Sequence, residues 1–402
     1  MNRPLGTAAP LAALVLAGSL LAGCAGGSNS DEAAGDVVRI TYIADLTGPG
    51  AFYGEDWAAG AEYAVDEIND AGGIGGRTLE IDVVDSASDQ AAAVGAMNSA
   101  ARSDSSVVMY ALLSQNALAM APVAQREEVP FIVGQSSVDG VTDVGDFVYR
   151  TSTSEGDYYG AMLRNLQEQG VESTAILYAG DNPTAVTNAT ERIPAIAEEL
   201  GIEVTDTIEV RTADTDYSQP ASRIVEGSPD AVANLTFGPA VTTSIQALRS
   251  AGYDGPLYGT SALGSGALTP AGDAAVDTYY PSAFIPAADL PWASGVAFLE
   301  EYEAATGDQP SFSTAGGHDQ VAFLAAALES IGEGEVTRNS LKDALAVVAA
   351  DGFVGATGDP IRFGEDRIAD TPGVLVRWDG TTETVAPGQQ GPLLDGYTGN
   401  DG

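Results

Sequence analysis

An alternation of strand and helix patterns between residues 38 and 102 is the feature that most constrains how this chain can fold. Residues 38–45 are apolar and rich in β-branched side chains, which predicts a buried strand, and residues 78–84 predict a second one. Between them, residues 54–70 repeat their apolar positions at helical spacing, and residues 89–102 predict another helix. Such a β-α-β-α unit predicts a parallel sheet with right-handed crossovers.

A glycine-rich run at residues 73–76 lies between the first predicted helix and the second strand. A dinucleotide-binding fingerprint needs its glycines after a strand and before a helix, where phosphate meets free backbone N–H groups. The order here is reversed, so the run predicts the end of a helix and a turn.

Within the same stretch, five features follow one another in order: the Thr47-Gly48-Pro49 turn, Tyr53-Gly54, Gly60-Ala61, the run at 68–76 and Asp85. In this order they resemble the opening of the solute-binding proteins of branched-chain amino acid ABC transporters. The resemblance extends, at the level of element order, over roughly the whole mature chain, and it is strongest before Arg150. That family has the type I periplasmic-binding fold, which implies an α/β architecture of two doubly wound parallel-sheet lobes joined by three hinge crossings. A ligand would then lie between the lobes at the strand carboxyl ends.

The rest of the chain indicates where the lobes begin and end. Three more strands are expected at 106–113, 129–134 and 147–151, and a similar alternating run restarts at residue 157. Helices are expected to begin at residues 117 and 317, and the tail from about residue 381 is expected to be loosely ordered. The implied crossings fall near Thr151, Ser282 and Asp370. They divide the chain into a first lobe at 37–151 and 283–369 and a second lobe at 152–282 and 370–398.

Residues 1–24 have the organisation of a bacterial lipoprotein signal peptide and are not part of the fold. The apolar segment at 8–21 is too short to span a bilayer comfortably. Leu21-Ala22-Gly23-Cys24 then matches a lipobox, in which the Cys24 thiol receives a diacylglyceryl group. Cys24 is the only cysteine, so an intramolecular disulfide is excluded. Residues 25–36 are small and polar, which predicts a flexible tether between the lipid anchor and the domain.

The charge of the chain excludes two classes of partner. The 402 residues carry a formal charge of −41 and a single lysine, Lys342. Nucleic acid requires a cationic face and an anionic membrane surface repels such a chain, so neither is an expected partner. With 45% hydrophobic and 18% charged residues, the chain is globular and large enough for two or more domains. The acidity is interpreted as a source of solubility, with a salty or extracellular setting.

Six loops are expected to face the cleft: residues 46–53, 114–116, 135–137, 179–184, 237–239 and 260–263. In amino-acid-binding members of the family, hydroxyls and backbone N–H groups of the third and fourth strand loops bind the ligand α-carboxylate. The resemblance implies this role for Ser114 and Ser137, with the backbone of Gln135 beside them. It also implies that the aromatic rings of Tyr53 and Phe237 pack against the ligand.

Two or three hydrogen bonds to a charged group, each contributing about 1.5–3 kcal/mol, would hold a carboxylate without an arginine. At each position the alternative is an ordinary loop serine or a core aromatic, and the joint placement after two successive strands favours binding. The candidate ligand-binding residues are Tyr53, Ser114, Gln115, Asn116, Gln135, Ser136, Ser137, Glu155, Asp181, Phe237 and Ser261.

Two positions depart from the family and leave the ligand open. Members that bind amino acids place an acidic residue after the strand at 256–259 to pair with the ligand ammonium, and this chain has Ser261 there. A tyrosine usually ends the loop after the strand at 174–178, where this chain has Pro183 or Thr184. Asp181 or Glu155 would supply the missing charge if the ligand is an α-amino acid. The alternatives are a carboxylate without an α-ammonium, an amide or a small aromatic acid.

The expected function is that of a monomeric, lipid-anchored solute-binding protein on the outer face of the cytoplasmic membrane, which delivers a small molecule to an ABC permease. A ligand-sensing module for a membrane receptor would have the same fold. A secreted hydrolase is a third alternative. However, the only histidine, His318, lies at the start of an apolar helix pattern, and no nucleophile elbow follows a strand. A glycosidase would need two opposed carboxylates, which a sequence does not place. No spaced metal-ligand cluster and no cofactor motif is found, so no enzyme activity, metal or cofactor is expected.

Overall fold

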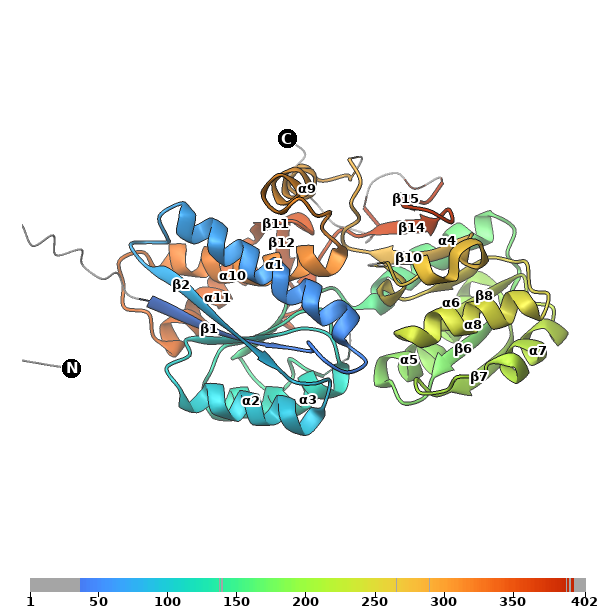
Figure 1. Cartoon of the computed structure of the whole chain (residues 1–402), viewed down its shortest axis with the longest axis horizontal. Helices are drawn as coiled ribbons and strands as arrows, with labels where there is room; N and C mark the ends of the chain where they lie inside the picture. Colours follow the sequence, from blue (N-terminus) through green and yellow to red (C-terminus); the bar gives the residue numbers. More distant parts are fainter. Residues whose placement is uncertain are drawn as a thin grey trace, which may run out of the picture. The chain divides into compact units, whose positions relative to one another are not determined.

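The computed structural model describes residues 37–387, except 137, 139, 265 and 289, together with residues 389, 392 and 393. These residues form two α/β lobes, each built on its own β-sheet (Figure 1). The predicted signal peptide with Cys24 and the predicted tether lie outside the described residues. Within the part that is described, none of the helices combines the length and the hydropathy needed to cross a bilayer.

The first sheet is parallel throughout, as predicted. Its strand order is β2-β1-β3-β4-β5, and every neighbouring pair runs in the same direction. Strands β3, β4 and β5 are buried along their whole length, as expected for a parallel sheet with both faces covered. The strands are β1 (Val37–Ala44), β2 (Thr78–Asp85), β3 (Val107–Tyr110), β4 (Phe131–Val133) and β5 (Val148–Arg150).

Helices α1, α10 and α11 cover one face of this sheet, and α2 and α3 cover the other (Figure 1). Glycines allow α1 and α10 to approach closely. A Cβ atom added to Gly60 would lie 2.0 Å from the carbonyl oxygen of Thr314. One added to Gly317 would lie 2.0 Å from the carbonyl oxygen of Trp57. The helices are α1 (Ala51–Asp70), α2 (Gln90–Arg102), α3 (Ser114–Arg126), α10 (Phe312–Ile331) and α11 (Arg338–Asp351).

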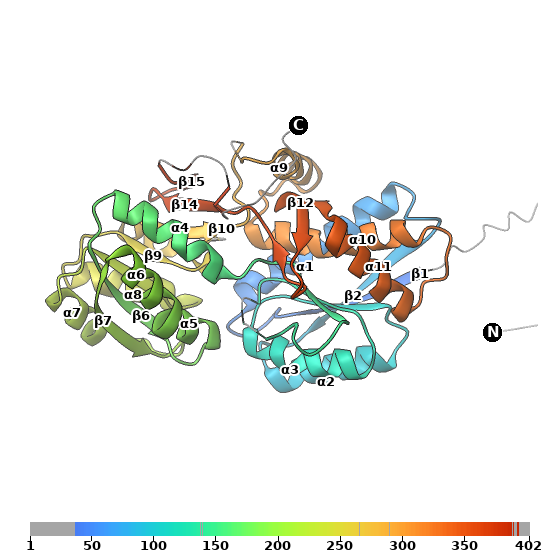
Figure 2. The same cartoon turned by 180° about the vertical axis from the view of Figure 1, so that it is seen from behind.

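The second sheet has seven strands in the order β15-β14-β10-β9-β8-β6-β7. The strands from β10 to β7 are parallel, whereas β14 is antiparallel to both β10 and β15. Helices α7 and α8 pack on one face, and α4, α5 and α6 pack on the other (Figure 2). The strands are β6 (Ser173–Ala179), β7 (Glu203–Val210), β8 (Ala231–Leu235), β9 (Leu257–Gly259), β10 (Thr278–Ser282), β14 (Val374–Trp378) and β15 (Glu383–Val385). The helices are α4 (Glu155–Glu168), α5 (Pro183–Thr187), α6 (Ile193–Leu200), α7 (Ser218–Glu226) and α8 (Pro239–Ser250).

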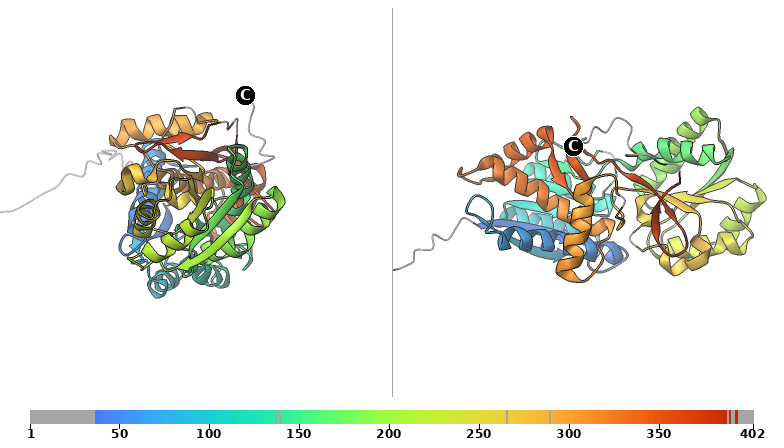
Figure 3. Two further views of the ribbon diagram at one scale, coloured as in Figure 1. Left: turned by 90° about the vertical axis from the view of Figure 1, so that its right-hand side faces the viewer. Right: turned by 90° about the horizontal axis from the view of Figure 1, so that it is seen from above.

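The chain passes between the two sheets three times within the described residues. It leaves β5 for α4, leaves β10 for α9 (Ala293–Thr306), and reaches β14 from the short strand β13 (Ala369–Asp370). Seen from above, the red strand β14 lies in the second lobe although it comes near the end of the chain (Figure 3). The first and third passages are bonded together, because the Tyr158 hydroxyl donates to the Thr371 carbonyl oxygen at 3.0 Å. Strand β13 pairs with β12 (Gly358–Phe363), which pairs with β11 (Phe353–Gly355).

Several boundaries differ from the sequence predictions. Helix α1 begins at Ala51 rather than at 54, α3 at Ser114 rather than at 117, and α10 at Phe312 rather than at 317. In α10 the start was hidden by Gly316-Gly317, because glycine has a low helix propensity but is required here by the packing against Trp57. The tail predicted to be loosely ordered contains β15, which pairs with β14.

Arg150 is a fully buried charged residue at the first passage between the sheets. Its guanidinium donates to the carbonyl oxygens of Ser136 at 3.3 Å and Val138 at 2.9 Å, in the loop after β4. It also donates to the Ser152 carbonyl oxygen at 3.0 Å and to the Ser154 hydroxyl. The fork of five N–H donors on arginine suits this role. One side chain thus fixes both a loop at the strand carboxyl ends and the segment that leads into the second lobe.

Replacing Arg150 by Met should lower the free energy of unfolding by roughly 3–5 kcal/mol, because each buried acceptor left without its donor costs about 1–3 kcal/mol. Urea denaturation followed by circular dichroism measures the change. The matched control is Arg39→Met. Arg39 has a 40% exposed side chain and pairs with Glu80 and Asp104, so its replacement should cost less than about 1 kcal/mol. Equal losses in the two variants would contradict the central role of Arg150.

His318 lies in the second turn of α10, not at its start, and it is packed inside the first lobe. Its ring centroid lies 4.8 Å from that of Phe298, and its Nδ1 lies 3.1 Å from Asp319 Oδ1. Its Nε2 lies 3.8 Å from Glu67 Oε2. Burial lowers the pKa of His318, but the two neighbouring carboxylates outweigh this effect and raise the pKa to about 9. The same pairing lowers the pKa of Glu67. His318 is therefore a charged structural residue at neutral pH.

The His318 site predicts a pH-dependent stability. The His318 pKa rises from 6.5 in the unfolded chain to about 9 in the fold. Its stabilisation is therefore complete below pH 6.5 and is lost as the pH rises through 9. The full effect corresponds to about 3 kcal/mol. Urea titrations between pH 6 and pH 9.5 should show a shallower decline in the unfolding free energy for His318→Gln than for the wild type. Identical slopes in the two proteins would assign the pH dependence to other groups.

Candidate functional site

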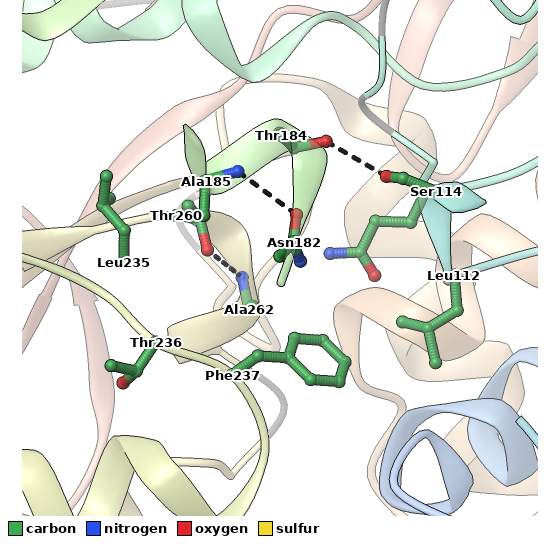
Figure 4. Close-up of a pocket in the computed structure, with 11 residues that line it drawn as sticks. Leu112, Ser114, Asn182, Thr184, Ala185, Leu235, Thr236, Phe237, Thr260 and Ala262 are labelled. Carbon is green, nitrogen blue, oxygen red and sulfur yellow. Dashed lines mark hydrogen bonds between the residues drawn. The ribbon is translucent and has the colours of Figure 1, made fainter. Parts of the chain in front are cut away.

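A cavity lies where the strand ends of the two sheets face each other. It measures about 50 Å³, and its walls come from loops after β3 and β4 in the first lobe and after β6, β8 and β9 in the second (Figure 4). Ligands of open α/β sheets bind at this edge, outside the carboxyl ends of the strands. The lining residues are Leu112, Ser114, Gln135, Asn182, Thr184, Ala185, Leu235, Thr236, Phe237, Thr260 and Ala262.

Ser114 is the central polar group of the first-lobe wall. It is the first residue of α3, where backbone N–H groups lack intrahelical acceptors. Its Oγ lies 3.0 Å from Thr184 Oγ1, a hydrogen bond that joins the two lobes (Figure 4). Two residues earlier, Leu112 has a φ of 109°, which a branched side chain rarely adopts. Backbone strain of this kind concentrates at functional sites.

Asp85 holds the loop after β1, which leads to Tyr53. Its carboxylate accepts from the backbone N–H groups of Thr47 at 3.2 Å and Ala87 at 2.7 Å, and from the Thr47 hydroxyl at 2.7 Å. The hydroxyl is the largest of the influences that lower the pKa of Asp85, so the carboxylate remains ionised. A Cβ atom added to Gly54 would lie 2.2 Å from the carbonyl oxygen of Asp45, so only glycine allows this close approach of α1 to β1.

Side chains also fix the three loops of the second-lobe wall. Each loop has one side-chain oxygen that accepts from a group two or three residues away, as in helix caps and polar turns. These contacts are Ala185 N–H to Asn182 Oδ1 at 3.2 Å, Thr236 hydroxyl to Asn234 Oδ1 at 2.8 Å, and Ala262 N–H to Thr260 Oγ1 at 3.2 Å. The walls of the cavity are therefore preformed rather than loose.

Gln135 bridges the two lobes at the inner end of the cavity. Its Nε2 donates to Ser261 Oγ at 2.9 Å, and its Oε1 is buried without a hydrogen-bond partner. Gln135 also lines a second cavity of about 30 Å³. Trp57 lies on the wall of that cavity, and its Nε1 is buried without a partner. Because a buried polar atom without a partner is costly, Gln135 Oε1 is an acceptor available to a ligand donor.

Tyr53 and Phe237 form an aromatic pair at the outer end of the cavity. Their ring centroids lie 5.2 Å apart with an interplanar angle of 34°. Phe237 lines the cavity and Tyr53 lies behind it, where the Tyr53 hydroxyl donates to the Ala262 carbonyl oxygen at 2.6 Å. Burial raises the pKa of Tyr53, so its hydroxyl stays a neutral donor. This bond is a further contact between the lobes.

None of the described side chains that line this cavity carries a charge. The polar lining groups are hydroxyls and carboxamides, and the apolar ones come from leucines, alanines and Phe237. A ligand would be oriented here by hydrogen bonds and backbone dipoles rather than by an ion pair.

Five of the sequence-predicted residues are brought together at the cavity. Ser114, Gln135 and Phe237 line it, and Tyr53 and Ser261 each contact a lining residue. Tyr53 was predicted in a loop, but it lies in the first turn of α1, which buries it completely.

The other candidates lie apart from the lining. The Gln115 carbonyl oxygen accepts from Gln90 Nε2 at 3.0 Å, so this residue joins α3 to α2. Asn116 and Ser136 are fully buried behind the wall. Asp181 is exposed, and its carboxylate accepts from the Thr212 N–H at 3.0 Å. This side chain therefore ties the end of β6 to the end of β7 and does not face the cavity. Ser137 and the side chain of Glu155 lie outside what the structure describes.

Sequence reasoning missed several lining residues, of which only Asn182, Thr184, Thr260 and Ala262 lie in loops that it named. The missed residues are Leu112, Asn182, Thr184, Ala185, Leu235, Thr236, Thr260 and Ala262. The clearest signal was Asn182-Pro183, an N-cap residue followed by proline at the first helical position. It predicts a helix start at the end of β6, facing the cleft.

A comparison with protein families decides the assignment. The family model described as periplasmic binding protein matches residues 37–383. The chain belongs to the periplasmic binding protein family. Membership implies an extracytoplasmic location and a role in binding a small solute.

Individual relatives of this periplasmic binding protein differ in what their names say they bind. The leucine-, isoleucine-, valine-, threonine- and alanine-binding protein of Pseudomonas aeruginosa is 23% identical over 314 residues, which cover 77% of this chain and 82% of the relative. A branched-chain amino acid transporter substrate-binding protein from Streptococcus pneumoniae, solved with isoleucine, has a TM-score of 0.77 and 22% identity over 87% of this chain and 99% of that one. A solute-binding protein from R. palustris, solved with benzoate, has a TM-score of 0.78 and 22% identity over 89% of this chain and 96% of that one. These likenesses confirm the type I periplasmic-binding fold.

Proposed function

We propose that this periplasmic binding protein captures a small carboxylate or amide between its two lobes and delivers it to the membrane permease of an ABC importer. The observation that carries the proposal is the uncharged cavity at the carboxyl ends of both sheets, with Ser114 and Gln135 on its wall. The names of the relatives support solute capture as the activity.

A carboxylate fits the first-lobe wall. The Ser114 hydroxyl and the N-terminal end of α3 offer hydrogen-bond donors and a positive dipole end to an anion. A hydrogen bond to a charged group contributes about 1.5–3 kcal/mol, so two of them account for binding in the micromolar range when apolar contacts add to them. The hydroxyl of Thr184 approaches the same place from the second lobe.

An α-amino acid fits the second-lobe wall less well. Ser261 stands where amino-acid-binding members of the family place an acidic residue, and its hydroxyl accepts from Gln135. The Asp181 carboxylate already accepts a hydrogen bond from the Thr212 N–H. The free acceptor on the wall is the neutral Gln135 Oε1, which suits an amide N–H or a protonated acid better than it balances a full ammonium charge. We therefore expect acids and amides to bind more tightly than the corresponding amino acids.

A thermal-shift screen of branched-chain amino acids, their keto acids, short amides and aromatic acids tests the proposal. A ligand at 100 times its Kd stabilises the bound form by roughly 2.7 kcal/mol, which raises the Tm of a protein of this size by several degrees. Ser114→Ala combined with Gln135→Ala should remove at least nine-tenths of the affinity for the best ligand.

The matched control for this screen is Ser222→Ala combined with Gln246→Ala, at two exposed positions of α7 and α8. It should bind as the wild type does. A best ligand without a carboxylate or amide, such as a neutral sugar, would refute the proposal. So would a best ligand that the Ser114/Gln135 double variant binds as well as the wild type.

A binding role without catalysis agrees with the site. The only histidine, His318, is held by Asp319 and Glu67 inside the first lobe, away from the cavity lining. The lining hydroxyls of Ser114 and Thr184 bond each other and have no adjacent general base among the lining side chains. The proposal therefore assigns no chemical step to the protein.

We further propose that the mature chain is anchored by lipid at Cys24. The support is the sequence Leu21-Ala22-Gly23-Cys24 behind a short apolar segment. Mass spectrometry of the membrane fraction should find the mature protein beginning at Cys24 with a diacylglyceryl modification. The Cys24→Ser variant should lack the modification and leave the membrane fraction. Unmodified wild-type protein in the medium would refute the anchor.

A further inference from the structure

A second, larger apolar groove lies beside the solute cavity. It measures about 370 Å³, whereas the cavity itself measures about 50 Å³. Its walls come from both lobes: the first turn of α1 on one side, and the start of α8 with the segment after η2 (Ser261–Leu263) on the other. The lining residues are Phe52, Tyr53, Gly238, Pro239, Thr242, Thr243, Ala267 and Pro270.

The aromatic pair is the partition between the groove and the cavity. Tyr53 lines the groove, Phe237 lines the cavity, and their ring centroids lie 5.2 Å apart. Phe237 is followed directly by Gly238, which lines the groove. The two spaces are thus separated by the thickness of one aromatic contact. Phe237 is half-buried, and a turn of its ring would open a passage between them.

The groove is built for an apolar occupant. No charged side chain is among its described lining residues, and two of the three hydroxyls there are already used. Tyr53 donates to the Ala262 carbonyl oxygen at 2.6 Å, and Thr243 donates to the Pro239 carbonyl oxygen at 3.2 Å. Phe52 is 51% exposed at the rim, and it is the only phenyl ring among the large apolar side chains that the described residues leave exposed. The exposed Phe52 ring extends the apolar surface of the groove, which an apolar occupant would cover.

Both lobes line this groove. A Cβ atom added to Gly266 would lie 3.7 Å from Phe52 Cζ, and one added to Gly238 would lie 3.6 Å from the Pro49 carbonyl oxygen. The two lobes therefore approach each other closely at Gly238 and at Gly266. An occupant of the groove contacts both lobes, as an occupant of the cavity does.

We infer that the solute is elongated and amphipathic, with its carboxylate or amide in the small polar cavity and an apolar tail that passes the Tyr53–Phe237 partition into the groove. This inference rests on the proposed function, because it extends the same site. The occupant is the tail of the solute rather than a partner protein. The reason is that the groove adjoins the solute cavity, and only the contact between the two rings separates them.

The test uses isothermal titration of the full mature chain with benzoate and with 4-methyl-, 4-ethyl-, 4-propyl- and 4-butylbenzoate. Each methylene group that enters the groove should tighten binding about fourfold, since the transfer of a buried CH₂ group from water contributes a factor of this size. Thr242→Phe fills the groove from α8 and should abolish the gain while benzoate still binds. The matched control, Gln246→Phe, places the same ring on the exposed side of α8 and should keep the gain.

Circular dichroism and melting curves check that the two Phe variants are folded. Phe52→Ser is a second test of the groove. It removes the exposed phenyl ring from one wall of the groove, and it should roughly halve the number of methylene groups that increase the affinity. Flat affinities across the series, or a gain that persists in Thr242→Phe, would overturn the elongated solute. If benzoates fail to bind while a compact acid, amide or amino acid from the thermal-shift screen binds, the inference falls and solute capture stands. If nothing in the screen or the series binds, both fall.

Discussion

The buried guanidinium of Arg150 links the loop after β4 to the segment that enters the second lobe. It holds the carbonyl groups of the loop after β4 and those of the segment that enters the second lobe. The loop after β4 carries Gln135, which reaches across to Ser261. A rotation between the lobes would therefore act on Gln135 in two ways. One is through Arg150, which joins the loop of Gln135 to the passage between the sheets, and the other is through the hydrogen bond to Ser261 in the second lobe. This short path of hydrogen bonds would couple solute binding to a movement of the lobes.

The distribution of charge separates solubility from recognition. The chain carries a formal charge of −41, yet the lining of the solute cavity and of the adjacent apolar groove is uncharged. For an anionic solute the field of the whole protein opposes the approach, and ions reduce this opposition beyond about 8 Å at physiological ionic strength. Once inside, the solute meets local dipoles that the distant charges hardly affect. Salt is therefore expected to act on the rate of capture more than on the specificity of the site.

The sequence was a good guide to the elements whose physical reasons are local. The strand at 38–45 and the glycine turn at 73–76 were both predicted, and the structure has β1 at Val37–Ala44 and positive φ at Gly73, Gly75 and Gly76. Helix starts were predicted less well where packing outweighs propensity, as at Gly316-Gly317 against Trp57. The site was predicted in part, because loop order places Ser114, Gln135 and Phe237 near one edge of the sheets. What sequence order does not give is the direction of a side chain. Asp181 lies in a predicted cleft loop but turns to Thr212, and Tyr53 turns behind Phe237 to reach Ala262.

The interleaving of the two lobes along the chain also bears on when the protein can fold. The first lobe needs α10 and α11, which begin 162 and 188 residues after the end of β5, the last strand of its sheet. The second lobe needs β14, which pairs with β10 through Pro281 and Leu375 across a long excursion of chain. Neither core is complete until nearly the whole polypeptide is present. Contacts of such long sequence separation are expected to slow folding, which would leave a newly made chain unfolded for longer and able to pass through a narrow channel.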